Sequence, residues 1–347
     1  MPARASYDRI VLHIGRQKSG TSVLQRTLHD NEAALTAAGI TYPNIARKGV
    51  AHHRLAISMT PGKLGDPQSR AEAERLRSEV AEALAAGKGI WLFSSEAFQN
   101  VPDPALLTGV FDPRRTDLIV YLREQYSFAQ SSYAQRIHAT RDTETFESFL
   151  QRTDHGHAAL LARWSERFGA RRLVVRGYSR STLVNGDIVD DFMAAAKLPE
   201  VALTRTGPPQ KPLAGGSLLE FKRALNGLAG LPREFDRLAF RTFPTIAASD
   251  PDFRAKPAVA AADVAAYRAR FTVENAALIS AHPQLREALA PAIPEPVHCF
   301  RERRDFRRIW LAIARESPKL FDLLIEAVGS EQPDETREMS IIRKTRP

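Results

Sequence analysis

The sequence predicts an α/β protein: a central parallel β-sheet flanked by helices, with a helical C-terminal extension. Three observations lead to this class. Short apolar runs alternate with longer helical patterns through the first two hundred residues, which is typical of βαβ units. The apolar runs lack in–out alternation, as expected of parallel strands that are buried on both sides. After Pro199 the strand signal ends, and helical patterns continue toward the C-terminus.

Each expected element follows from its local pattern. Runs of strand length that are mainly apolar predict strands at residues 10–14, 39–43, 90–93, 117–122 and 173–175. Helices are predicted where apolar residues recur at helical spacing, which occurs at residues 21–38, 71–86, 124–139, 157–168, 187–197, 258–281 and 300–328. From about Glu331 onward the chain is polar, and we expect this tail to fray.

Proline-rich segments suggest the domain organisation. Pro208-Pro209 marks a loop after the strand region, and Pro291, Pro294 and Pro296 form a joint near the C-terminus. We therefore expect one α/β domain over residues 1–296, helical from about residue 200. A helical extension over residues 297–347, ending in the frayed polar tail, would follow it.

Composition narrows the classes of function. The chain has 347 residues, is 44% hydrophobic and carries a formal charge of +9. No stretch is long and apolar enough to span a membrane, no secretory leader is evident, and the single cysteine, Cys299, excludes an internal disulfide. We expect a cytoplasmic protein. The basic residues are scattered and are not interleaved with aromatic residues, so the charge favours a small polyanionic ligand over nucleic acid.

The loop after the first predicted strand is the most informative segment. It reads Gly15-Arg16-Gln17-Lys18-Ser19-Gly20-Thr21-Ser22 and leads into the first predicted helix. Exposed amides and the positive end of a helix dipole form an anion site at such a position, and glycines let the backbone approach a phosphate closely. The alternative is an ordinary strand-to-helix turn that is capped by Thr21 or Ser22.

This loop differs from the loop that binds nucleoside triphosphates. Gly15 and Gly20 have the spacing of G-x-x-x-x-G-K-[ST], but Thr21 occupies the position of the lysine. The lysine of this loop is Lys18, so it must address another part of the ligand. No obvious acidic magnesium ligand ends a strand, because the apolar run at 90–93 contains no Asp or Glu and Leu122 leads into Arg123. ATP and GTP chemistry is therefore disfavoured.

Three segments carry a resemblance to a known family. The segment Leu12 to Gln25 resembles the 5′-phosphosulfate loop of sulfotransferases that use 3′-phosphoadenosine 5′-phosphosulfate (PAPS), with Ser19 replacing the more common threonine. Val120-Tyr121-Leu122-Arg123, followed by Ser131, is similar to the family's 3′-phosphate motif. Leu173 to Tyr178 is a weaker match. The resemblance spans roughly residues 10–198, is looser to about His282, and implies a P-loop NTPase-like fold.

The resemblance also implies roles for individual residues. Lys18 would stabilise the bridging oxygen of PAPS as negative charge develops there, and no metal would be required. Residues that would hold the co-substrate, or its product adenosine 3′,5′-bisphosphate, are Arg16, Gln17, Lys18, Ser19, Gly20, Thr21, Ser22, Arg123, Ser131 and Tyr178. Tyr178 could equally be a core tyrosine. The late Arg-Lys-Gly loop of cytosolic members is not found in this sequence, and Arg301 to Arg304 could substitute for it.

An acceptor hydroxyl also needs a base. Glu96 follows a predicted strand, and members of the family that sulfate carbohydrates use a glutamate at a similar place. His52 and His53 are its rivals, His53 being the better placed, and each could instead be a surface residue. His13 lies on a buried strand and reads as a core histidine. Leu28, Asn31, Leu35, Gly39-Ile40 and Tyr42-Pro43 resemble the bacterial branch of the family. Together with Glu96, this resemblance favours a carbohydrate or glycolipid acceptor.

Two other functions remain open. One is a small-molecule kinase with a degenerate P-loop, which would bind ATP with magnesium. The other is a non-catalytic nucleotide-binding protein, although a decayed site has no reason to keep Lys18, Arg123 and Ser131 together. The expected partner is a small-molecule or glycan acceptor, and the C-terminal amphipathic helices leave a homodimer open.

Overall fold

A parallel β-sheet of five strands forms within the residues that the computed structural model describes, which are 7–205, 212–291, 302–329 and 336–347. The strands, in chain order, are β1 (Arg9–His13), β2 (Ile40–Thr41), β3 (Ile90–Ser94), β4 (Thr116–Leu122) and β5 (Leu173–Gly177). Their order across the sheet is β2-β3-β1-β4-β5, and each neighbouring pair is parallel. The predicted α/β class and its parallel sheet are confirmed.

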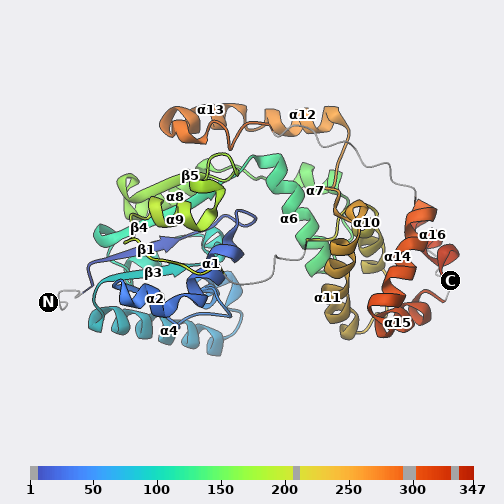
Figure 1. Ribbon diagram of the computed structural model, residues 1–347, viewed down its shortest axis with the longest axis horizontal. Helices are drawn as coiled ribbons and strands as arrows, with labels where there is room; N and C mark the ends of the chain where they lie inside the picture. Colours follow the sequence, from blue (N-terminus) through green and yellow to red (C-terminus); the bar gives the residue numbers. More distant parts are fainter. Residues whose placement is uncertain (1–6, 206–211, 292–301, 330–335) are drawn as a thin grey trace. The chain divides into compact units, whose positions relative to one another are not determined.

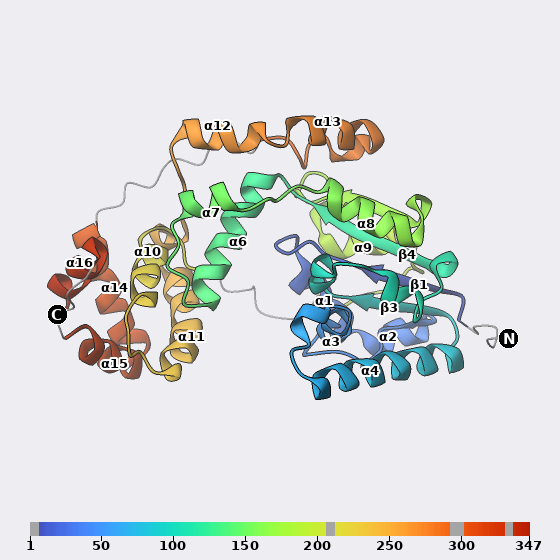
Figure 2. The same ribbon diagram turned by 180° about the vertical axis from the view of Figure 1, so that it is seen from behind.

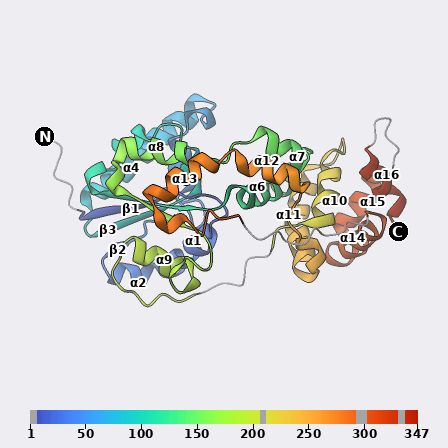
Figure 3. The same ribbon diagram turned by 90° about the horizontal axis from the view of Figure 1, so that it is seen from above.

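Strand β1 shows why both faces of the sheet are covered. Successive side chains of a strand point to opposite faces. Ile10 and Leu12 pack in one core with residues of α4 and α8, whereas Val11 packs in another with residues of α1, α2 and α9. Figure 3 shows these two groups of helices on opposite sides of the strands. This two-sided burial explains the uninterrupted apolar runs of the sequence.

The chain folds into two compact units. The sheet unit comprises residues 1–125, 156–207 and 271–291, and the helical unit comprises residues 126–155, 208–270 and 292–347. The helices of the sheet unit, labelled in Figure 1 where there is room, are α1 (Thr21–Asp30), α2 (Glu32–Ala37), α3 (His53–Ser58), α4 (Pro67–Ala86), α5 (Ala105–Thr108), α8 (Ala158–Phe168), α9 (Ile188–Ala195) and α13 (Thr272–Ala281). The boundary expected at residue 296 lies outside the described residues and stays a prediction.

The helical unit is built around α14. Its helices are α6 (Gln125–Ala139), α7 (Phe146–Arg152), α10 (Gly216–Asn226), α11 (Arg233–Ser249), α12 (Ala261–Ala269), α14 (Glu302–Glu316), α15 (Pro318–Val328) and α16 (Arg337–Thr345). The first residue of α6, Gln125, still belongs to the sheet unit. Helix α14 packs against α10, α11, α15 and α16 (Figure 2). Phe221, Phe306 and Trp310 lie fully buried in the core that these helices share.

Three helix predictions need correction. The helix predicted at 300–328 is divided at Ser317 into α14 and α15. The helix predicted at 21–38 is divided at Asn31. The Asn31 side-chain amide donates to the Thr27 carbonyl, which the Asn31 backbone amide would bond in a continuous helix, and also to the Thr204 carbonyl. The helix predicted at 258–281 is α12 and α13, separated at Arg270 and Phe271, because these neighbours belong to different units.

The prediction of a frayed C-terminal tail is also wrong. Helix α16 forms there because Thr336 caps its N-terminus and Met339 and Ile342 are buried. The indole of Trp310 donates a hydrogen bond to the carbonyl of Ile342 at 3.0 Å, which fastens α16 to α14. Cys299 and Arg301 lie outside the described residues. Among the helices of the described ranges, none has the length and apolar character needed to cross a membrane.

Candidate functional site

The strand order produces a topological switch point between β1 and β4. The connection after β1 runs through α1 and α2 to β2 on one side, whereas the chain that leaves β4 returns as β5 on the other side. Open α/β sheets bind ligands outside the carboxyl ends of strands at such a point. The loop of residues 14–20 follows β1, and Arg123 follows β4. Both predicted anion-binding segments therefore lie at the switch point.

Glycines are required at both ends of this loop. Gly15 and Gly20 have positive φ angles of 100° and 75°. Residues other than glycine rarely adopt this backbone conformation, because their Cβ atom makes it sterically unfavourable. A Cβ atom on Gly15 would lie 3.1 Å from the Cα of Glu96, and one on Gly20 would lie 3.0 Å from the Tyr178 ring. The Tyr121 amide donates to the Gly15 carbonyl at 3.0 Å, so β4 continues to hold the backbone here. The loop is held between its neighbours with little room for larger residues.

Helix α1 begins after the loop without a side-chain cap. Gly20 occupies the N-cap position and, among the described residues, no side chain bonds to the first amides of the helix. The alternative of a turn capped by Thr21 or Ser22 is therefore wrong. Ser19 is buried and donates its hydroxyl to the Arg16 carbonyl at 2.5 Å, inside the loop. An uncapped N-terminus of a ten-residue helix attracts an anion through its amides and its dipole.

Lys18 and Arg123 place two cations beside this helix end. An Nη1 donor of Arg123 bonds to the Lys18 carbonyl at 3.3 Å, and Lys18 itself has a positive φ of 62°. Burial lowers the pKa of the Lys18 ammonium; the nearby Glu96 carboxylate opposes this effect, and the Arg123 charge adds to it. Within the described chain, no carboxylate lies within ion-pair distance of the Lys18 ammonium. An anion bound here would relieve the repulsion between the two cations.

Glu96 and His53, the two rival bases, lie next to each other. Glu96 begins a short 3₁₀ helix (Glu96–Asn100) directly after β3. Its Oε2 accepts a hydrogen bond from Gln25 of α1 at 2.9 Å, and its Oε1 lies 3.9 Å from Nε2 of His53. The other ring nitrogen of His53 is hydrogen-bonded to Ser95 at 2.8 Å. The structure thus brings a carboxylate and an imidazole together, each with an orienting partner.

His52 and His13 have structural roles. Both side chains are fully buried. Nε2 of His52 bonds to the Pro43 carbonyl at 2.9 Å, and its Nδ1 accepts from the Ser94 amide at 3.1 Å. His13 is hydrogen-bonded to Ser94 at 2.8 Å, so its expected core role is confirmed. The surface position considered for His52 is wrong.

His157 joins the loop to the end of β4. It is fully buried at the start of α8. Its Nε2 donates to the Arg123 carbonyl at 2.9 Å, and its Nδ1 accepts from the Arg16 guanidinium at 2.5 Å. The Glu274 carboxylate accepts from the His157 amide and, at 3.0 Å, from the Ala158 amide, which fixes this helix start. One side chain therefore connects two predicted nucleotide-binding segments.

The remaining predicted residues are spread more widely. Gln17 is half-buried in the loop, and Ser22 is exposed on α1. The Tyr178 amide donates to the Leu122 carbonyl at 2.7 Å, and its ring lies against Gly20. Ser131 lies on α6 in the helical unit, where its hydroxyl donates to the Ser127 carbonyl. The pairing of Ser131 with Arg123 stays a prediction.

Gln25 and His157 are site residues that the sequence reasoning missed. A signal existed for Gln25, because this polar residue falls on the inward side of α1 beside Leu24 and Leu28. No local signal exists for His157, whose partner Arg16 is 141 positions away. Comparison with known proteins does not assign the site: no family model, no curated protein and no solved structure matches the chain significantly.

The two buried histidines predict a loss of stability in acid. Burial lowers the pKa of both His13 and His52 to about 3, whereas an unfolded histidine titrates near pH ~6.5. The unfolded chain therefore binds protons first as the pH falls. The contribution of these two histidines to the free energy of unfolding is fully present above pH ~6.5. It should fall toward pH ~4, by up to about 1.4 kcal/mol per pH unit for each histidine. Urea unfolding at a series of pH values measures this slope.

The matched variants for this experiment are His52→Gln and His282→Gln. His52→Gln removes one titrating group and should give a shallower slope than the wild type. His282 is only partly buried, so His282→Gln should keep the wild-type slope. Parallel slopes for the wild type and His52→Gln would show that His52 is not buried in its neutral form.

A second prediction concerns the His157 connection. His157→Phe keeps a buried ring but removes the bonds to Arg16 and Arg123. The free energy of unfolding should fall by about 1–3 kcal/mol, because buried polar groups lose a partner. Urea unfolding measures the change, with His282→Phe, at a partly exposed position, as a control that should stay within about 0.5 kcal/mol of the wild type. Equal stability of His157→Phe and the wild type would rule out the connection.

Proposed function

We propose that this chain is a sulfotransferase that moves the sulfuryl group of PAPS to an acceptor hydroxyl or amine. The observation that carries the proposal is the arrangement at the switch point: an uncapped helix start, a glycine-bounded loop and two cations, Lys18 and Arg123. The sequence resemblance supplies the reaction class. The sheet order and the loop after β1 are consistent with a P-loop NTPase-like fold for the sheet unit.

The roles follow from charge and position. The amides of Gly20, Thr21 and Ser22 would bind the 5′-phosphate at the positive end of α1. Lys18 would neutralise the charge that develops on the bridging oxygen, which is the main task of catalysis in such a transfer. Arg123, at the end of β4, would bind the 3′-phosphate through its forked donors. In this proposal Ser131 adds a hydroxyl to the 3′-phosphate, Tyr178 contacts the adenine, and the reaction requires no metal.

The acceptor proton would go to the Glu96–His53 pair. Gln25 donates to one oxygen of Glu96 and leaves the other facing His53. We assign Glu96 as the base, with His53 as the alternative, because Glu96 follows β3 at the same edge of the sheet as Lys18 and Arg123. The acceptor in this proposal is a carbohydrate or glycolipid hydroxyl and the compartment is the cytoplasm.

Isothermal titration with adenosine 3′,5′-bisphosphate tests the donor. The bisphosphate should bind without magnesium and more tightly than ATP, because Lys18 stands in mid-loop and Thr21 occupies the position of the NTPase lysine. Arg123→Ala should weaken binding by about 10- to 100-fold, the loss expected for a charge-assisted pair of bonds. Lys18→Ala should keep part of the affinity and lower kcat by about 100- to 1000-fold. Binding of ATP with magnesium, but not of the bisphosphate, would establish the kinase alternative instead.

Glu96→Gln tests the base. The amide keeps the shape and a hydrogen bond but cannot accept the proton, so kcat should fall by about 100- to 10,000-fold while bisphosphate affinity stays unchanged. His53→Gln, compared under the same conditions with a panel of carbohydrate acceptors, should have the smaller effect. A larger effect of His53→Gln would reverse the two roles, and full turnover by both variants would remove this pair from catalysis.

A further inference from the structure

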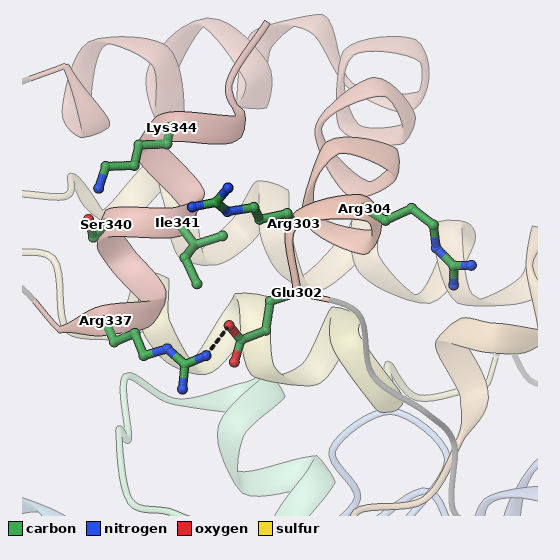
Figure 4. Close-up of a pocket in the computed structure, with 7 residues that line it drawn as sticks. All are labelled: Glu302, Arg303, Arg304, Arg337, Ser340, Ile341 and Lys344. Carbon is green, nitrogen blue, oxygen red and sulfur yellow. Dashed lines mark hydrogen bonds and ion pairs between the residues drawn. The ribbon is translucent and has the colours of Figure 1, made fainter.

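A basic groove of about 800 Å³ lies in the helical unit, between α14 and α16 (Figure 4). Its charged residues are Arg303 and Arg304 from the start of α14, Arg337 and Lys344 from α16, and Glu302. All four basic side chains are exposed. Four cations therefore face one acid in a single groove.

The acids nearby leave two of these cations unmatched. Glu302 is paired with Arg337 at 3.0 Å, and the buried Asp305 is paired with Arg304 at 2.9 Å. For Arg303 and Lys344, the described part of the chain supplies no carboxylate at ion-pair distance. An excess of like charge on one surface raises the local potential and favours an anion there.

Other arginines of the same unit are matched closely. Arg308, one turn further along α14, is paired with both Asp250 and Asp252. Arg223 of α10 is paired with Glu220 at 2.8 Å and with Glu338 at 3.1 Å. Arg308 and Arg223 thus have the carboxylate partners that Arg303 and Lys344 lack among the described residues.

The lining indicates what kind of anion fits. In Figure 4 the side chain of Arg303 extends from α14 toward α16, where Ser340 and Ile341 line the groove, whereas Arg304 points away from α16. A guanidinium supplies a fork of donors, an ammonium supplies a point charge, and the Ser340 hydroxyl can add a further bond. No aromatic side chain lines the groove within the described residues, so stacking on bases has no platform here.

We propose that the α14–α16 groove binds a compact polyanion that carries at least two phosphate or sulfate groups, one at Arg303 and one at Lys344. Two anionic groups on one molecule satisfy both unmatched cations, and the polar lining suits a hydrophilic ligand. The inference does not rest on the sulfotransferase proposal, because no lining residue of the groove has a role in that proposal. It assigns this unit a binding role of its own.

Isothermal titration of the full chain with inositol hexakisphosphate, and in parallel with sucrose octasulfate, tests the groove. Arg303→Ala/Lys344→Ala should bind both probes at least about tenfold more weakly than the wild type, because it loses two charge-assisted contacts. The control Arg307→Ala/Lys319→Ala removes the same charge from exposed positions outside the groove. It should stay within about twofold of the wild type. Circular dichroism checks folding, and Arg303→Gln/Lys344→Gln replaces the alanine variant if that variant unfolds.

Four results would overturn the proposal. The first is failure of the wild type to bind either probe. The second is an equal loss in the groove variant and in the control, which would indicate only a general effect of net charge. The third is loss of probe binding in Lys18→Ala/Arg123→Ala with wild-type binding in the groove variant, because the polyanion would then occupy the sheet unit. A longer duplex DNA that binds more tightly than both probes, with the same dependence on Arg303 and Lys344, would reassign the groove to nucleic acid.

Discussion

Strand β1 lies in the middle of the sheet, paired in parallel with β3 on one side and β4 on the other, and the candidate site depends on this double pairing. His13 stands opposite Ser94 of β3, and Glu96 follows two residues later. On the other side Gly15 bonds to Tyr121, and Arg123 follows two residues later. A slip of one residue in either register would displace its segment by roughly 3.3 Å and turn its side chains to the opposite face. The positions of Glu96 and Arg123 beside the loop are therefore consequences of backbone pairing.

The site also concentrates unfavourable terms that a ligand can relieve. Burial desolvates the Lys18 ammonium, which gains no ion pair among the described residues, and Arg123 adds a second positive charge nearby. Gly20 leaves the first amides of α1 without a side-chain partner. Without a bound anion, the buried charges and the uncapped amides lower the free energy of unfolding, and the rest of the sheet unit must offset this loss. An anion of the right shape would satisfy all of them together, which is why we regard them as one site.

Much of the fold was predictable because short segments of the sequence carry the patterns typical of strands, helices and loops. The strands were found from short apolar runs, and the loop from glycines at a fixed spacing. The single helix predicted at 258–281 is wrong because its apolar pattern continues through Arg270, while the chain passes from one unit to the other at Arg270 and Phe271. The polar tail was misjudged because Met339 and Ile342 are too few to signal a helix until Trp310 provides a partner. His157 could not be found at all, since only the fold brings it to Arg16.

The two units alternate along the chain, which changes from one to the other after residues 125, 155, 207, 270 and 291. A ribosome therefore delivers neither unit in one piece. The five strands are complete once β5 has emerged, but the sheet unit still lacks α13 until residues 272–281 are made. The helical unit lacks α14, α15 and α16 for longer still. During synthesis both cores stay incomplete until these late helices emerge, so the apolar side chains that the late helices cover remain exposed until then.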